Sequence, residues 1–332
     1  MEKKIGEYCK NPYLKSYGVE TMTEKMTRRY GERYLEYRKK WAMAEDLHTP
    51  DFPLNLELDL IDACTLSCPQ CLRSPDLLPE YKDFLGKGTQ LEYAQIVKLL
   101  DEGQRYRLLS VNIGGSGECM LHPDFLKICR SIMDHDIVEL RIISNGTRLT
   151  EEIAEGLIDQ QVHILSISID AASSQTYGKV RGKPEMYQKV VDNATRFLIL
   201  REKNKSEFPM LRVTFVQQGK NNHEVSSFID SWTSKADLID IQTYADFRKT
   251  DYKSDFKCNH PWKRLAIYAD GHVVPCCGFP GIVFNFGNIR EKSLQNIWAS
   301  EQMRGLRKAL LENKYPSQCL KCMGVLTSFA EA

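Results

Sequence analysis

The chain has 332 residues, of which 42% are hydrophobic and 27% charged, and its formal net charge is only +1. This is the composition of an ordinary globular protein, long enough for one large domain and a smaller one. A nearly neutral chain without a long run of like charge lacks the basic surface that binds nucleic acid. No run of about 18 or more apolar residues predicts a membrane span, and the charged N-terminus does not resemble a signal peptide, so we expect a cytoplasmic protein.

Residues 1–50 are predicted to form a helical extension. Tyr30, Tyr34, Tyr37 and Trp41 recur at helical spacing within a highly charged stretch. This spacing predicts an aromatic stripe that packs the extension onto the rest of the molecule.

Strand-like and helix-like segments alternate over residues 51–249. Six apolar runs are predicted strands: 54–60, 108–113, 138–144, 163–169, 211–216 and 238–244. Segments with helical periodicity lie between them: 93–100, 125–133, 151–159 and 186–201. Such alternation predicts a parallel sheet with right-handed crossovers, and six units are too few for a closed eight-stranded barrel. The predicted fold is therefore α/β, an open, partial (β/α)6 TIM-like barrel.

The alternation stops after residue 244. Residues 265–269 and 272–276, joined by an Asp-Gly turn, predict a β-hairpin, and a helix is predicted over 293–311. Three regions are thus expected: an N-terminal helical extension at 1–50, the partial barrel at 51–249 and a small C-terminal domain at 250–332.

Eight of the 11 cysteines fall into two groups, which in a cytoplasmic protein favours metal binding over disulfides. The first group is Cys64, Cys68 and Cys71, spaced Cys-x3-Cys-x2-Cys directly after the first predicted strand. Three thiolates can hold three irons of a 4Fe–4S cluster and leave the fourth iron open to a ligand. Zinc is the alternative, but structural zinc sites have four ligands and no fourth cysteine lies nearby.

This cysteine motif, in its place after the first strand, resembles the signature of the radical S-adenosylmethionine (SAM) superfamily. The resemblance implies an enzyme in which the open iron binds SAM through its amino and carboxylate groups. It also implies reductive cleavage of SAM to a 5′-deoxyadenosyl radical, which abstracts hydrogen from a substrate C–H bond. A low-potential electron donor such as flavodoxin or ferredoxin would supply the electron.

Polar and glycine-rich clusters follow the next three predicted strands, where the carboxyl ends of parallel strands meet. Their members are Gly114, Gly115, Gly117 and Glu118 after the second strand, Ser144 and Asn145 after the third, and Ser168 and Asp170 after the fourth. In the resembled family these strand ends bind SAM, and Arg181 matches an arginine that pairs with the SAM carboxylate. Turn or cap roles are the alternative for Ser144 and Asn145, and a solvated loop position is the alternative for Arg181.

The second cysteine group resembles the SPASM domain of radical SAM enzymes in its shortened "twitch" form. It contains Cys258, Cys276, Cys319 and Cys322, with Gly271 between the first two, and a fifth cysteine, Cys277. The resemblance implies a second, auxiliary 4Fe–4S cluster on these four thiolates, although four cysteines would also suit zinc.

Cys277, directly after Cys276, is a candidate hydrogen-atom donor, because a thiol S–H can quench a carbon radical. The alternative is a small buried hydrophobic side chain. Donation by a thiol would give epimerisation, whereas electron transfer to the auxiliary cluster would give dehydrogenation.

The expected substrate is a small molecule: a sugar, a polyol or an aminoglycoside-like intermediate. Modification of a ribosomal peptide is the alternative reaction, and a non-catalytic iron–sulfur electron carrier is the alternative of another class. We expect no nucleic-acid or membrane partner.

Overall fold

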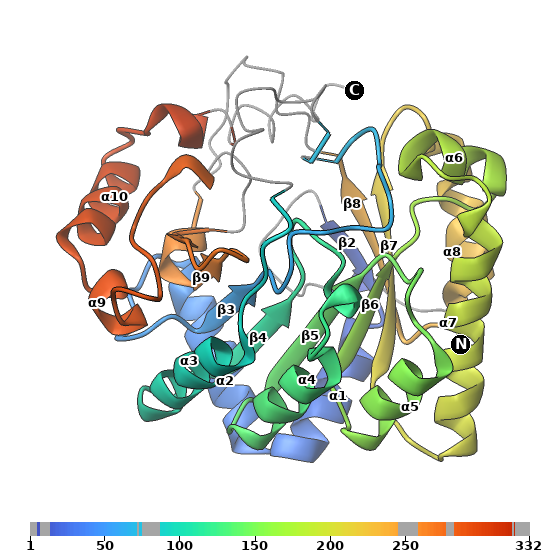
Figure 1. Cartoon of the computed structure of the whole chain (residues 1–332), viewed down its shortest axis with the longest axis horizontal. Coiled ribbons are helices and arrows are strands. Elements are labelled where there is room, and N and C mark those ends of the chain that lie inside the picture. The colour runs from blue at the N-terminus through green and yellow to red at the C-terminus, as the bar shows by residue number, and fades with distance from the viewer. Residues whose placement is uncertain are drawn as a thin grey trace.

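The computed structural model in Figure 1 describes residues 5–6, 14–71, 73–74, 87–244, 258–276, 282–320 and 322. Its strands are β1 (Ile5–Gly6), β2 (Leu14–Tyr17), β3 (Asn55–Leu58), β4 (Ser110–Ile113), β5 (Glu139–Ser144), β6 (Ile164–Ser168), β7 (Met210–Gln217), β8 (Leu238–Thr243), β9 (Arg264–Ile267) and β10 (Val273–Val274). Its α-helices are α1 (Val19–Tyr30), α2 (Glu32–Glu45), α3 (Tyr93–Arg105), α4 (Phe125–Asp134), α5 (Glu151–Asp159), α6 (Ser174–Arg181), α7 (Met186–Lys203), α8 (Val225–Thr233), α9 (Leu294–Trp298) and α10 (Glu301–Leu311).

The six predicted strands are all present as β3 to β8, and each pairs with the next in parallel. At least one helix separates each strand from the next, as expected for right-handed crossover units. The described strands form one sheet in the order β1-β2-β8-β7-β6-β5-β4-β3-β9-β10. The predicted α/β fold with a parallel, partial-barrel sheet is confirmed.

The two faces of the parallel sheet differ in polarity, because residues paired across neighbouring strands share a face. One face carries buried apolar side chains that form a common core with the helices: Leu56, Leu58, Val111, Ile113, Leu140 and Ile142. The other, which we call the inner face, carries most of the polar side chains of these strands, Glu57, Asn112, Arg141, Ser166, Ser168, Thr214 and Asp240, interspersed with apolar Ile143, Ile164, Met210 and Leu238. The apolar face thus fixes the helices, and the inner face is left for polar contacts.

The predicted N-terminal helical extension is present as α1 and α2, and it is preceded by two short strands, β1 and β2, that were not predicted. β2 pairs antiparallel with β8 and supplies hydrogen bonds to the edge of the parallel sheet that β8 would otherwise leave open. The helical stretch is divided at Gly31, whose φ of 55° favours glycine. Of the predicted aromatic stripe, Tyr34, Tyr37 and Trp41 are buried on α2, and Tyr30 is partly buried at the end of α1; both helices lie below the strands in Figure 1.

The predicted C-terminal hairpin is present as β9 and β10. β9 also pairs in parallel with β3, so the sheet continues across the expected boundary at residue 250. The predicted helix over 293–311 is two helices, because the Ser300 hydroxyl accepts a hydrogen bond from Met303 N (3.1 Å) and starts α10 afresh. The division into three regions stays a prediction.

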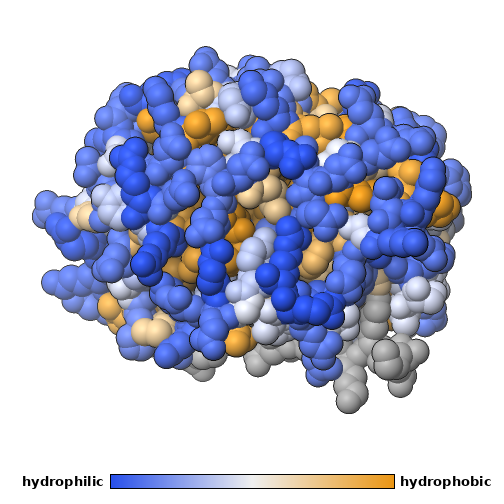
Figure 2. Space-filling view, turned by 90° about the horizontal axis from the view of Figure 1, so that it is seen from below, coloured by the Kyte–Doolittle hydropathy of each residue, from blue (hydrophilic) through white to orange (hydrophobic). Residues whose placement is uncertain are grey.

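The surface seen from below in Figure 2 is mostly hydrophilic, with hydrophobic residues showing between charged ones. None of the helices in the described part of the chain is both long and apolar enough to cross a bilayer.

Candidate metal centre

Cys64, Cys68 and Cys71 lie on the loop that follows β3, at the carboxyl end of the parallel sheet. Burial raises the pKa of the Cys68 thiol to about 11, and negative charge at Cys71 and Cys64 acts in the same direction. Burial also raises the pKa of Cys71. Three thiols within electrostatic reach of one another, of which Cys68 and Cys71 are costly to ionise alone, suit a site where bound metal offsets the thiolate charge.

Each of the three sulfurs faces an N–H donor. The distances are 3.5 Å from Asn145 Nδ2 to Cys64 Sγ, 4.0 Å from Arg181 Nη1 to Cys68 Sγ, and 3.5 Å from Arg73 N to Cys71 Sγ. Donors at sulfur stabilise thiolate charge and are typical of iron–sulfur sites. Among the described residues no three His, Cys, Asp or Glu side chains converge on one ion.

The glycine segment after β4 packs directly against the start of the cysteine loop. Glu118 N donates to Ala63 O at 2.7 Å, and a Cβ on Gly117 would lie 1.8 Å from Ile61 O. A Cβ on Gly114, whose φ is +139°, would lie 2.7 Å from Ile143 Cβ at the end of β5. Two of the predicted glycines therefore permit close packing of the loop against its neighbours.

Glu118 lies inside the structure, with 1% of its surface exposed. Its carboxylate accepts hydrogen bonds from Ser144 Oγ (2.8 Å), Asn145 N (2.8 Å) and Met120 N (3.2 Å). Burial raises the pKa of Glu118, opposed by these donors. Glu118 thus joins the ends of β4 and β5 and fixes Asn145, whose amide also donates to Thr65 Oγ1 at 3.0 Å.

Asp170 and Arg181 form an ion pair at 2.6 Å beside Cys68. Asp170 has a φ of 61° and also accepts from Val216 N at 2.8 Å. Arg181 is the last residue of α6, and a Cβ on the following Gly182 would lie 2.8 Å from Ser67 O. The structure therefore brings Asp170, Arg181 and the cysteine loop together.

The hydroxyl of Ser168, on the inner face, instead accepts from Thr214 Oγ1 at 3.3 Å.

In the second cysteine group, Cys319 and Cys258 are neighbours, since charge on Cys258 raises the pKa of Cys319, which burial already raises, to about 12. Cys276 and Cys322 are half-buried. Cys277, the candidate hydrogen donor, lies outside the described residues.

Several residues around the cysteine loop were missed in the sequence. Asp59 accepts from Gly117 N (3.3 Å) and from the Ser116 hydroxyl, and Lys183 Nζ donates to Thr65 O at 2.8 Å. Asp62 pairs with Arg73. Asp59 and Asp62 lie on either side of the end of the predicted strand 54–60. This position is the one feature of the sequence that could have identified them.

Asp59 predicts a pH dependence of stability. Burial raises the pKa of Asp59 from 3.8 to about 6, so the folded state holds the proton more tightly. Stability from this group is therefore greatest below pH 3.8 and falls by about 3 kcal/mol as the pH rises to about 6. We expect Asp59→Asn to remove this loss. Denaturant unfolding of wild type and variant over that range checks it, and parallel pH profiles would contradict it.

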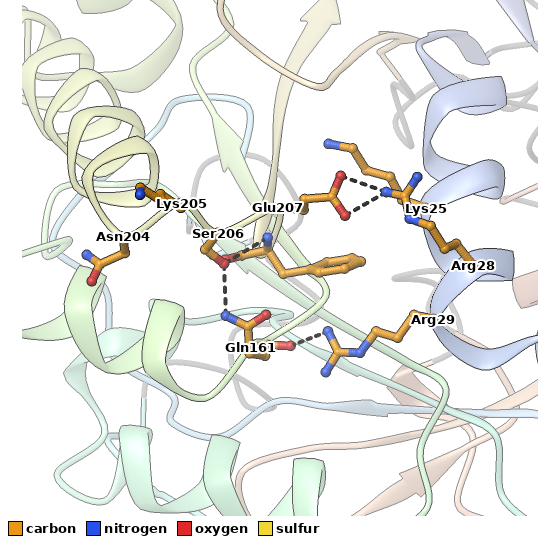
Figure 3. Close-up of a pocket in the computed structure, with 9 residues that line it drawn as sticks. Lys25, Arg28, Arg29, Gln161, Asn204, Lys205, Ser206 and Glu207 are labelled. Atoms are coloured by element: carbon orange, nitrogen blue, oxygen red, sulfur yellow. Dashed lines mark hydrogen bonds and ion pairs between the residues drawn. The ribbon is translucent and has the colours of Figure 1, made fainter.

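The pocket in Figure 3 lies away from the cysteine loop, between α1 and the loop after α7, and has a volume of about 530 Å³. Arg28 binds Glu207 (2.6 Å), Lys25 binds Asp237 (2.9 Å), and Arg29 donates to Gln161 O (2.9 Å). Most of its cations thus have partners within the protein, and no cysteine lines it, so it is not the candidate site.

Two family models match the chain. One, described as the radical SAM superfamily, matches residues 58–225, which is more than half of the 332 residues. The other, SPASM, described as an iron–sulfur cluster-binding domain, matches residues 258–323. The second match favours iron–sulfur over zinc for the C-terminal cysteines.

Known proteins resemble the chain over most of its length. The tungsten-containing aldehyde ferredoxin oxidoreductase cofactor-modifying protein of Pyrococcus furiosus is 25% identical over 317 residues, covering 80% of this chain and 86% of that protein. BtrN in complex with AdoMet and 2-DOIA shares the fold with a TM-score of 0.53 and 15% identity, covering 83% and 93% of the two chains. Streptococcus suis SuiB bound to precursor peptide SuiA does so with a TM-score of 0.56 and 16% identity, covering 87% and 74%.

Proposed function

The chain belongs to the radical SAM superfamily of enzymes, and we propose that it removes a hydrogen atom from a C–H bond of a hydroxyl-rich small molecule, a sugar, polyol or aminoglycoside-like compound. A 4Fe–4S cluster and SAM are the cofactors of this superfamily, and the SPASM domain implies auxiliary iron–sulfur binding. Bound together, they supply reductive cleavage of SAM to a 5′-deoxyadenosyl radical. Epimerisation or dehydrogenation would follow, with the electron supplied by a low-potential protein.

The proposed ligands of the SAM-binding cluster are Cys64, Cys68 and Cys71. Support comes from the N–H donor that faces each sulfur. The proposed ligands of the auxiliary cluster are Cys258, Cys276, Cys319 and Cys322.

The proposed SAM-binding residues divide into two roles. Gly114, Gly115, Ser144, Asn145, Ser168 and Arg181 are proposed at the pocket itself. Gly117, Glu118 and Asp170 are proposed to position the others, because each is engaged with the protein: Gly117 by the backbone of the cysteine loop, Glu118 by the end of β5, and Asp170 by Arg181.

The observation that carries the substrate class is the polarity of the inner face of the sheet. Asn112 Nδ2 donates to Glu57 Oε1 at 2.9 Å, and Arg212 faces Asp240 at 3.6 Å. Arg141, the neighbour of Asn112 across the sheet, and Ser168, the last residue of β6, are partly exposed. Glu57, Asn112, Arg212 and Asp240 are buried and make this part of the sheet polar, and the partly exposed Arg141 and Ser168 are in a position to offer hydrogen bonds to substrate hydroxyl groups.

The test is an anaerobic turnover experiment in deuterated water with aminoglycosides, nucleotide sugars and peptides as candidate substrates. Epimerisation would add one deuterium at carbon, and dehydrogenation would remove two hydrogens without adding deuterium. Faster formation of 5′-deoxyadenosine with a polyol or sugar than with every peptide supports the proposal. Turnover with peptides alone would overturn it.

Peptide modification is the second candidate. Similarity to SuiB, solved with its precursor peptide, favours it, as does 23% identity over 305 residues to the Bacillus subtilis subtilosin biosynthesis protein AlbA. A peptide would also find partners on the polar inner face, so the substrate panel separates the two candidates.

A further inference from the structure

The guanidinium of Arg181 makes two contacts: an ion pair with Asp170 and a contact with the sulfur of Cys68 on the cysteine loop. Nη2 forms the ion pair with Asp170 Oδ2 at 2.6 Å, and Nη1 lies 4.0 Å from Cys68 Sγ. The Arg181 side chain is only 13% exposed. A cation in this setting is weakly screened by solvent, so it acts strongly on charge at the neighbouring sulfur.

The position of the Arg181 guanidinium is fixed by the contacts of its partner Asp170 and of the helix α6 that carries it. Asp170 is fixed by Val216 N at 2.8 Å, and its backbone carbonyl accepts from Asn221 Nδ2 at 2.9 Å. At the other end of α6, Glu224 accepts from Ala172 N (2.6 Å) and Thr176 Oγ1 (2.7 Å). Because α6 is anchored at both ends, Arg181 keeps its position relative to the cysteine loop.

We propose that Arg181 is a positioning residue that raises the reduction potential of the cluster bound at Cys64, Cys68 and Cys71, with Asn145 acting in the same way at Cys64; this rests on the cluster ligands proposed above. One-electron reduction adds negative charge to the cluster. A fixed cation and N–H donors at its sulfurs stabilise the reduced form more than the oxidised form. This role is separate from any contact of Arg181 with SAM, because it operates before SAM binds.

The test is an EPR-monitored redox titration of the anaerobic full-length protein without SAM or substrate. The signal followed is the one absent from Cys68→Ala. For Arg181→Met, the ratio of reduced to oxidised cluster at the wild-type midpoint potential should fall about tenfold, which corresponds to a downward shift of about 59 mV. Arg181→Lys keeps the positive charge but loses the fixed, planar donor. The midpoint potential should therefore fall less in Arg181→Lys than in Arg181→Met.

Lys183→Met is the matched control, since Lys183 is a cation on the same turn whose ammonium donates to Thr65 O and not to a sulfur. In Lys183→Met we expect the ratio of reduced to oxidised cluster at the wild-type midpoint potential to stay within about twofold of the wild-type ratio. Equal shifts in Lys183→Met and Arg181→Met would overturn the proposal, as would an unchanged midpoint in Arg181→Met with full iron and sulfide content.

Asn145→Asp provides a second variant should Arg181→Met fail to keep its cluster. It retains the oxygen that accepts from Thr147 N (2.9 Å) but replaces the donor facing Cys64. Its midpoint should also fall, and a rise would overturn the proposal. Failure of the proposed function would be seen separately, as a Cys68-dependent signal that does not respond to SAM.

Discussion

Replacing Cys68 with alanine is expected to lower the rate of 5′-deoxyadenosine formation from SAM by about a thousandfold or more, equivalent to about 4 kcal/mol of activation free energy. Two thiolates cannot hold three irons of a cubane, so the open iron that would bind SAM is lost. Cys68 is only 8% exposed within the loop. The assay is anaerobic turnover with dithionite, with iron and sulfide counted in the same samples.

Cys129→Ala is the matched control. Cys129 is fully buried on α4 and belongs to the hydrophobic core, so its loss should cost about 1 kcal/mol of stability and leave SAM cleavage unchanged. Wild-type rates of 5′-deoxyadenosine formation in Cys68→Ala would show that the cluster is held elsewhere.

Gly117→Ala is expected to destabilise the protein by about 3 kcal/mol and to reduce the iron bound at the cysteine loop. The added Cβ would lie 1.8 Å from Ile61 O and 2.9 Å from Ala63 O, both backbone atoms that cannot rotate aside. The segment after β4 would have to move away from the loop and lose the hydrogen bond from Glu118 N to Ala63 O. Chemical unfolding and iron content per chain measure the two effects.

Gly305→Ala is the comparison variant, because its Cβ on α10 would have no heavy atom within 4 Å other than those of its chain neighbours and of the helix's own backbone. Alanine there should raise stability by about 0.5–1 kcal/mol without changing iron content. If Gly117→Ala behaved like Gly305→Ala, close packing between the glycine segment and the cysteine loop would be refuted.

The parallel sheet was predictable because the two sequence patterns that indicate it, apolar runs and helical periodicity, each depend only on neighbouring residues. Apolar runs of strand length and helical periodicity between them are properties of neighbouring residues, and all six strands were found within a few residues. The strand β2, and the pairing of the predicted strand β9 with β3, were not predictable in this way. β2 and β9 are four residues long and depend on partners far along the chain, β8 and β3.

The candidate site, too, was predictable only where its signals are local in the sequence. The cysteine spacing and the position of Glu118 could be seen in the sequence, but the direction in which each side chain points could not. Glu118 turns inward to Ser144 and Asn145, and Arg181 pairs with Asp170, because partners for buried charges are set by tertiary packing. Asp59 and Lys183 were missed for the same reason.

The most direct test is the amount of 5′-deoxyadenosine and methionine that the reduced, anaerobic protein makes from SAM. We predict that both products form in equal amounts, that they require reductant, and that they disappear in Cys68→Ala while Cys129→Ala retains them. An intact cluster at Cys64, Cys68 and Cys71 that forms neither product would contradict the proposed chemistry.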